Sequence, residues 1–433
     1  MIRRATGMAR RGIGAYARTV REATPNARRY LLSVALQNIA IGLLGTVFAL
    51  YVSAAGMSPA VVGDVEGALA LASAVVCLLL PPLVSVVGYR WLLVAAGIAF
   101  AASRLGQTLE VGATAVILMG LAYGIGDGIM RSVGVAFLSE NGPAGSKRTL
   151  LFTVDFALRI TAAFVGALIG GLVPTLLQGT VGEVDALRIA IAVAGVLFLA
   201  SAVPVLGVSE KSHAGVRVRA TYMSAVRGFS SWGRLTRLAV PEALISFGAG
   251  LIMPFVPLFL KVHLSANVAQ IGAIQGTASV VMAVATLSTP LLVKRFGLVR
   301  TIVFTELASL PFLLTIPMAL GLPAVAVAMW ARGALMNMSW PIYNQIAVEG
   351  VASADKPLVV GWMSVAWSIA WLGGSMVGGR LAESSYTVGY FVTAALYASG
   401  ALASWLLLRD LRMGAPLPLP AENLTAEAAE PRA

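Results

Sequence analysis

The sequence predicts an all-α membrane protein of twelve membrane-spanning helices, arranged as two parallel repeats of six. Three observations carry this prediction: the composition, the number of apolar blocks and an internal repeat. Of the 433 residues, 58% are hydrophobic and only 12% are charged, and the mean hydropathy is +0.86. Soluble globular domains carry about twice as many charged residues, so we expect this chain to lie in a membrane.

The apolar residues gather in twelve blocks, each close to the roughly 20 residues that a helix needs to cross a bilayer. Short turns with glycine, proline or polar residues separate these blocks. The expected spans are residues 30–52, 59–82, 91–110, 112–138, 149–176, 186–207, 238–260, 267–293, 301–320, 323–347, 358–382 and 388–408.

The longest connection divides the chain into two halves. We expect a basic cytoplasmic segment, a six-helix bundle, a cytoplasmic central loop, a second six-helix bundle and a disordered cytoplasmic tail rich in Pro, Ala and Glu. These five parts are residues 1–29, 30–207, 208–237, 238–408 and 409–433.

The two halves repeat the same pattern. An offset of 209 residues aligns Gly63 with Gly272 and Gly67 with Gly276, and an offset of 208 aligns two glycine motifs further along. A repeat in parallel orientation requires an even number of helices in each unit, which agrees with six and six.

The basic residues indicate an orientation. If both termini are cytoplasmic, the inner segments hold 24 of the 31 Lys and Arg residues, as the positive-inside rule requires. We therefore assign the net charge of +12 to orientation in a bacterial plasma membrane and expect no nucleic-acid partner. The single cysteine, Cys77, excludes an internal disulfide, and we expect no metal and no cofactor.

Six plus six helices around a basic central loop resemble the major facilitator superfamily of secondary transporters. That family's signature Gly-x-x-x-Asp-(Arg/Lys)-x-Gly-(Arg/Lys) belongs after the second helix. Here Gly88 and its repeat Gly297 remain, but Ser85 and Lys294 stand at the aspartate positions. The charge-based lock of the family is therefore not expected here.

A second signature, Gly-Pro-x-x-Gly-Gly, is associated with drug and proton antiporters of this family. The stretch GALIGG matches it apart from the proline, and GSMVGG in the second half matches equally well. Because both halves carry it, close helix packing explains the motif as well as antiport does. Its glycines are Gly166, Gly170, Gly171, Gly374, Gly378 and Gly379.

Charged residues inside spans are functional candidates, because each costs about 2.5–3.5 kcal/mol at a helix centre. The network predicted here comprises Glu66, Asp127, Arg131, Asp155 and Arg159. The four Asp and Arg residues form either pairs within each helix or crossed pairs, and we hypothesise one network facing the transport cavity. It either staples two helices or acts as a proton-operated latch, with Asp127 as the first proton carrier and Glu66 as the second.

Three further charges, Arg104, Glu242 and Glu306, are placed nearer helix ends, where long side chains reach water. We assign them a structural role.

The second half is rich in Trp and Met, which suit varied apolar shapes. Arg332, Met336, Trp340 and Tyr343 recur at helical spacing. The expected substrate cavity comprises Gln37, Asn38, Arg332, Met336, Asn337, Trp340, Tyr343, Asn344, Trp367 and Trp371.

The resemblance implies a secondary transporter that works by alternating access. We expect proton-coupled efflux of an amphipathic or hydrophobic organic molecule by a monomer, with protons and membrane lipids as further partners. A lipid or lysolipid translocator and a nutrient symporter of the same fold are alternatives, and a non-transporting receptor or scaffold is a rival of another class. The chain has no Gly-x-x-x-x-Gly-Lys-(Ser/Thr) loop for ATP, and we expect no enzyme.

Overall fold

The computed structural model describes residues 23–109, 112–141, 146–209, 228–229, 231–349, 351 and 356–409. These ranges form twelve helical spans in the predicted order, so the predicted fold class is confirmed. The expected basic segment before residue 23 and the tail after residue 409 lie outside the described ranges.

The first half contains α2 (Pro25–Ala54), α3 (Pro59–Val87), α4 (Tyr89–Gln107), α5 (Ala113–Asn141), α6 (Ser146–Val181) and α7 (Glu183–Leu206). The second half contains α9 (Trp232–Ile252), η1 (Met253–Phe255), α10 (Val256–Leu264), α11 (Val268–Phe296), α12 (Leu298–Thr315), η2 (Ile316–Met318), α13 (Leu322–Val348), α14 (Lys356–Ser384) and α15 (Tyr386–Leu408). The segments α9, η1 and α10 together make one span.

Helix boundaries follow the local chemistry of the chain. Gly88 joins α3 to α4 with φ 83°, and Gly297 joins α11 to α12 with φ 80°, a conformation that favours glycine. Pro254 and Pro257 lack the backbone N–H that a helix needs; Pro254 lies in the short 3₁₀ turn η1, and Pro257 lies in the first turn of α10. The helix α9 begins at Trp232, inside the segment assigned to the central loop.

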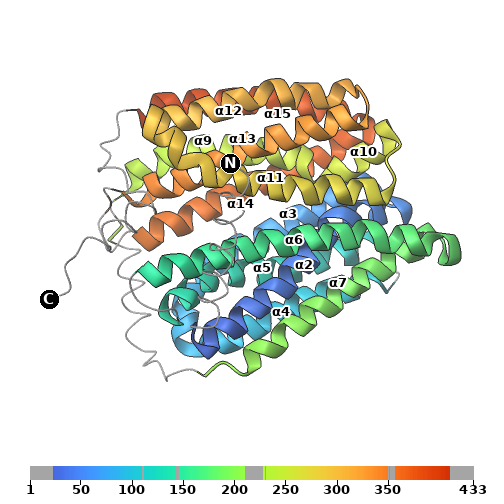
Figure 1. Ribbon diagram of the computed structural model, residues 1–433, viewed down its shortest axis with the longest axis horizontal. Helices are drawn as coiled ribbons and strands as arrows, with labels where there is room; N and C mark the ends of the chain where they lie inside the picture. Colours follow the sequence, from blue (N-terminus) through green and yellow to red (C-terminus); the bar gives the residue numbers. More distant parts are fainter. Residues whose placement is uncertain are drawn as a thin grey trace, which may run out of the picture.

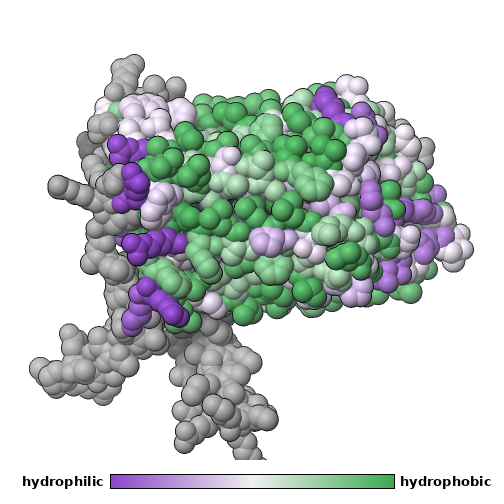
Figure 2. All heavy atoms as spheres, turned by 90° about the horizontal axis from the view of Figure 1, so that it is seen from above, coloured by the Kyte–Doolittle hydropathy of each residue, from purple (hydrophilic) through white to green (hydrophobic). Residues whose placement is uncertain are grey.

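The surface has the belt of a membrane protein. Figure 2 shows a broad hydrophobic band between hydrophilic residues at the two ends of the molecule. Among the described residues, ten helical segments are long and apolar enough to cross a membrane. The remaining two spans, α4 and α13, each carry a buried arginine, Arg104 and Arg332. The chain is therefore an integral membrane protein.

Both halves use the same order of neighbouring helices. In the first half the contacts run α3, α5, α4, α7, α2, α6, and in the second they run α11, α13, α12, α15, α9, α14. The halves lie side by side (Figure 1) and meet chiefly where α3 packs on α14 and α6 packs on α11. The sequence repeat thus corresponds to a repeat of structure.

We call the end of the molecule where α2 begins and α15 ends the terminal face, and the opposite end the distal face. The halves pack backbone against backbone towards the distal face. A Cβ on Gly63 of α3 would lie 3.2 Å from Cα of Gly379 of α14, and one on Gly272 of α11 would lie 2.9 Å from Cα of Gly171 of α6. Any side chain at these positions would push the halves apart.

Within the second half, α14 depends on the same close packing. A Cβ on Gly378 would lie 2.7 Å from Cα of Leu251 in α9, whereas one on Gly361, also in α14, meets nothing within 4 Å. We expect Gly378→Ala to destabilise the fold by about 1–3 kcal/mol, because it overpacks a backbone contact. Thermal unfolding in detergent measures this as a lower Tm. The matched variant Gly361→Ala should keep or raise the Tm, and equal Tm values for both variants would contradict the packing.

Candidate functional site

The ion pair of α5 lies deep in the first half. Arg131 Nε donates to Asp127 Oδ2 at 2.6 Å, and Ser73 Oγ of α3 donates to the same oxygen at 2.8 Å. The pair is therefore held within one helix and anchored to its neighbour. Arg131 lies ten residues from the end of α5, which is about 15 Å from the terminal face.

Neighbouring glycines show where Arg131 lies on the surface of α5. Cβ atoms built on Gly124 and Gly134 of α5 meet α3 and Tyr30 of α2, respectively, and Arg131 falls between these two contact faces. The exposed residue Ile125 marks a different face of α5, which suits lipid. The side chain of Arg131 is 55% exposed between these two packed faces.

A second ion pair lies on α6. Arg159 Nε donates to Asp155 Oδ2 at 2.8 Å, and Arg159 Nη2 donates to the hydroxyl of Tyr30 in α2 at 2.9 Å. Both pairs form within their own helices, and α2 packs between α5 and α6. The hypothesis of one shared network is therefore wrong for this structure: the four charges form two separate pairs.

Polar and aromatic residues are exposed on one face of α13. Trp340 is 59% exposed, and Asn337 and Asn344 are exposed beside it. Asn337 Nδ2 donates to the carbonyl of Gly333 at 2.9 Å and to Met282 Sδ of α11 at 3.0 Å. Side-chain amides on this face indicate an interior surface, because lipid offers them no partner.

The predicted stripe along α13 is divided between two environments. Arg332 is buried against Tyr397 of α15 and Met253 of η1, and Tyr343 is buried against Ser404 of α15. Each step of four residues turns a helix about 40° past a full turn, so Arg332 lies about 80° from Trp340. Arg332 and Tyr343 belong to the core of the second half, and their assignment to the cavity is wrong.

The cavity residues predicted on α2 and α13 include further core residues. Gln37 is buried and donates to Ser33 and to Ser201 of α7, both at 3.3 Å, so it faces its own half and its assignment is also wrong. Asn38 donates to the carbonyl of Val34 at 2.8 Å and is partly exposed. Met336 of α13 is also buried.

Glu66 lies at the contact between the halves. The indole Nε1 of Trp371 in α14 donates to Glu66 Oε2 of α3 at 3.3 Å. Gln275, the repeat partner of Glu66, donates to the carbonyl of Gly45 in α2 at 3.1 Å. Trp371 also stacks on Trp367, with ring centroids 6.5 Å apart. The two repeat positions therefore both bridge the halves, one with a carboxylate and one with an amide.

The glycine motifs of α6 and α14 make equivalent contacts. A Cβ on Gly166 or Gly170 would meet the backbone of α2, and one on Gly374 or Gly378 would meet that of α9. The last glycine of each motif faces the other half. Gly171 would contact α11, and Gly379 would contact α3.

Two ion pairs join the halves at the distal face. Arg380 Nη1 of α14 lies 2.9 Å from Asp64 Oδ1 of α3, and Lys261 of α10 pairs with Glu183 of α7. Together with the glycine contacts, these pairs hold the two halves together at the distal face.

Three charges predicted to reach water near helix ends are buried instead. Arg104 is buried with its guanidinium 4.7 Å from the ring centre of Phe48 and 4.2 Å from that of Tyr123. Glu242 and Glu306 are buried in the second half, where Tyr343 donates to Glu306 Oε1 at 3.2 Å. None of the three reaches water at a helix end.

A polar stripe could have revealed the burial of Glu306. Thr301, Thr305 and Ser309 recur every four residues along the otherwise apolar α12, and all three are buried.

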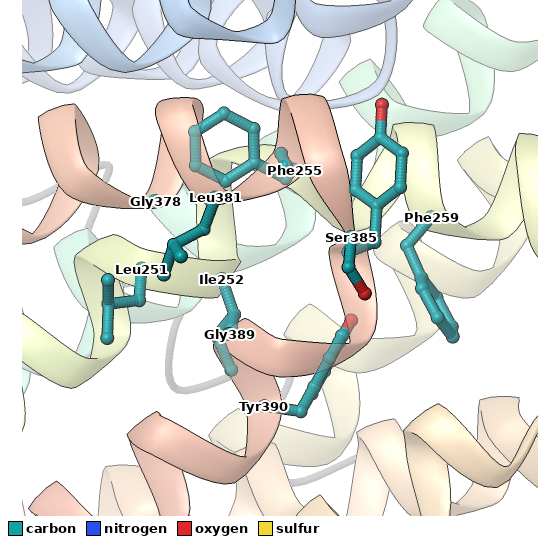
Figure 3. A pocket seen from close by; sticks show the side chains of 11 residues that line it. Leu251, Ile252, Phe255, Phe259, Gly378, Leu381, Ser385, Gly389 and Tyr390 are labelled. Carbon is teal, nitrogen blue, oxygen red and sulfur yellow. The ribbon is translucent and has the colours of Figure 1, made fainter.

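A small pocket opens near the distal face of the second half (Figure 3). Residues of α9, η1, α10, α14 and α15 line it, including Phe255, Phe259, Leu381 and Tyr390. The lining contains no charged residue, and it lies apart from both ion pairs of the first half. We do not assign the candidate site to it.

Comparison with known proteins supports the fold. The family model described as Major Facilitator Superfamily matches residues 238–431. A mutant of the nucleoside transporter NupG superposes with a TM-score of 0.70 at 14% identity, covering 89% of this chain and 100% of that chain. No curated protein sequence matches this chain.

Two further solved structures are similar. A bacterial homolog of the human lysosomal transporter Spinster, in an inward-facing and unoccupied conformation, has a TM-score of 0.68 at 15% identity and covers 90% of this chain and 98% of that chain. A D-xylose–proton symporter has a TM-score of 0.65 at 16% identity and covers 88% of this chain and 97% of that chain. This chain shares their fold.

The distal ion pairs should hold the halves together. In a Cys77→Ser background, a cysteine at the buried position of Ala167, which packs under α11, reports when α6 and α11 separate. We expect Lys261→Gln with Arg380→Gln to speed its labelling by a thiol reagent about fivefold, because two partly exposed ion pairs contribute about 1 kcal/mol.

The control for this experiment is Arg188→Gln. It removes an ion pair with Asp185 on the same end of the molecule but within α7, so labelling should not change. Equal labelling rates in all three proteins would show that the inter-half pairs do not hold the distal side closed.

Proposed function

We propose that this chain is a secondary transporter of the major facilitator superfamily and works by alternating access. The observation that carries the proposal is the unequal packing of two repeated halves. They touch through glycine backbones and ion pairs towards the distal face, whereas exposed polar residues of α5 and α13 lie on the terminal side of that contact. Rocking the halves about the interior site would exchange the open side.

The positive-inside rule supports a cytoplasmic terminal face. In that orientation the structure is the conformation closed to the outside, with the interior site reached from the cytoplasm. The similarity to an inward-facing solved structure is consistent with this assignment. The membrane would be a bacterial plasma membrane.

Glu66 is the residue that we propose for proton coupling. Its carboxylate accepts the hydrogen bond from Trp371 across the halves, and Arg104 and Asp127 are its charged neighbours. A hydrogen bond to an ionised acceptor is about twice as strong as a neutral one. Protonation of Glu66 would therefore weaken an inter-half contact and favour opening of the distal side.

The cargo that we propose is an amphipathic or hydrophobic organic molecule, exported in exchange for protons. Exposed Trp340 and partly buried Trp367 and Trp371 supply the apolar contacts. The fold itself does not determine the cargo, because the similar structures include a nucleoside transporter and a D-xylose–proton symporter.

The coupling proposal predicts a pH-dependent conformation. We expect labelling of Ala167→Cys to speed up as the pH falls from 8 to 5, after normalisation to a cysteine at the exposed distal residue Ser58. Glu66→Gln keeps the shape of a protonated carboxyl group and should label at the fast rate at both pH values. Trp371→Phe, which removes only the donor and part of the ring, should behave in the same way.

Gln275→Asn is the matched control in the other half. It shortens the amide that bridges to Gly45 but removes no titratable group, so the pH dependence should remain. A labelling rate of Ala167→Cys that is constant with pH while Glu66 is intact would contradict proton coupling through Glu66. If the cysteine at position 167 never reacts in the folded protein at any pH, alternating access would be contradicted. A non-transporting receptor or scaffold would then be favoured.

A further inference from the structure

At the positions equivalent to the two Asp–Arg ion pairs of the first half, the second half carries the same pair of residue types, Met and Trp. At the offset of 209, Asp127 and Arg131 correspond to Met336 and Trp340. The structure supports this alignment, because Gly124 packs on α3 and its partner Gly333 packs on the equivalent helix α11.

The same replacement occurs on the next pair of helices. At the offset of 208, which the glycine motifs set, Asp155 and Arg159 correspond to Met363 and Trp367. Cβ atoms built on Gly166 and Gly374 meet α2 and its equivalent α9, so this alignment also holds in space. Each Asp and Arg four residues apart in the first half thus corresponds to a Met and Trp four residues apart in the second half.

The exposure of the side chains follows the same order in both halves. Met336 and Met363 are buried, and the aspartates are less exposed than the arginines four residues later. The exposed fraction is 23% for Asp127 against 55% for Arg131, and 13% for Asp155 against 34% for Arg159. The more exposed residue at each of these positions is therefore an arginine in the first half and a tryptophan in the second.

The guanidinium of Arg131 has N–H groups that are available to bind a ligand. Its hydrogen bond to Asp127 uses Nε alone, so both Nη groups have no partner within the described part of the chain. A guanidinium with a free fork binds a carboxylate or phosphate in bidentate fashion. Arg159, by contrast, also spends Nη2 on Tyr30, so Arg131 is the stronger anchor.

We infer that the interior site takes an amphipathic organic anion, with its carboxylate or phosphate on Arg131 and its apolar body against Trp340. This inference rests on the proposed transporter function and gives its cargo a chemical class. The opposite polarity, an organic cation over the tryptophan faces, fits less well. The more exposed charge of the pair is the guanidinium, with 55% exposure for Arg131 against 23% for Asp127.

The test uses three probes with one apolar body and three charges. They are 2-naphthoate, 2-naphthalenemethanol and (2-naphthylmethyl)trimethylammonium, titrated by calorimetry into the purified full-length chain in nanodiscs. We expect 2-naphthoate to bind about tenfold more tightly than the alcohol, because charge-assisted hydrogen bonds are the strong ones. The cation should bind most weakly.

Variants separate a binding role from a structural one. Arg131→Gln should weaken 2-naphthoate about tenfold and leave the alcohol within twofold, whereas Trp340→Leu should weaken both probes alike, by about fivefold, through lost stacking. Asp127→Asn keeps the guanidinium and frees Nε, so it should bind 2-naphthoate at least as tightly as the wild type. If the pair were only a staple, Asp127→Asn and Arg131→Gln would change binding in the same direction.

Two controls keep the result interpretable if Arg131→Gln folds poorly. The double variant Asp127→Asn with Arg131→Gln leaves no unpaired charge and should lose 2-naphthoate as the single variant does. Arg188→Gln, which breaks the pair with Asp185 on α7, should not change binding.

Three outcomes would overturn the inference: tighter binding of the cation, unchanged 2-naphthoate binding in the double variant, or no binding of any probe to the wild type. Binding at equilibrium does not require transport. Binding of 2-naphthoate through Arg131 to a chain whose cysteine at position 167 never reacts would support this inference and contradict the transporter. If that cysteine reacts but 2-naphthoate does not bind, the transporter proposal would be supported and the anion inference contradicted.

Discussion

The cost of a charge inside a bilayer governs the first half of this protein. A lone charge at a helix centre is expensive, so membrane proteins pair such charges or turn them to an internal space. Both solutions occur together here. Asp127 and Asp155 each pair with the arginine one turn later in the same helix, and each arginine is more exposed than its aspartate. A pair made within one helix moves with that helix, so it survives a rocking motion that would break a pair made between the halves.

Glycine residues form the contact between the two halves, and a transporter needs this contact to separate. At Gly63, Gly171, Gly272 and Gly379 the halves meet backbone to backbone, and such contacts interdigitate few side chains. Two ion pairs at the distal face and the Glu66–Trp371 hydrogen bond add a small polar contribution. Partly exposed ion pairs contribute about 0–1 kcal/mol each, so these polar contacts do not commit the halves to a single conformation.

The sequence predicted the features that depend on local information. Twelve spans, the two repeats and the possibility of pairs four residues apart follow from apolar length, internal alignment and helical geometry. The relation between helices was not predictable in the same way. α5 and α6 are consecutive in the chain, yet α2 packs between them, which separates the two ion pairs. The sequence placed Arg332 and Tyr343 on the same face of α13 as Trp340. A helix rotates about 40° past a full turn every four residues, so Arg332 and Tyr343 lie towards the core instead. Glu306 seemed close to a helix end because α12 begins at Leu298, earlier than the apolar block indicated.

A symmetric scaffold with asymmetric side chains explains how a cargo could bias its own passage. The repeat fixes the backbone, since the same glycines must close the same contacts in both halves, but it leaves the residues of the interior walls free to differ. With arginines on one wall and tryptophans on the other, neither half alone satisfies a molecule that has both a charge and an apolar body. Such a molecule gains its full contact free energy only when both walls approach it. Its binding therefore favours conformations in which the halves close around the site, and a ligand that touches one wall alone has no such differential effect.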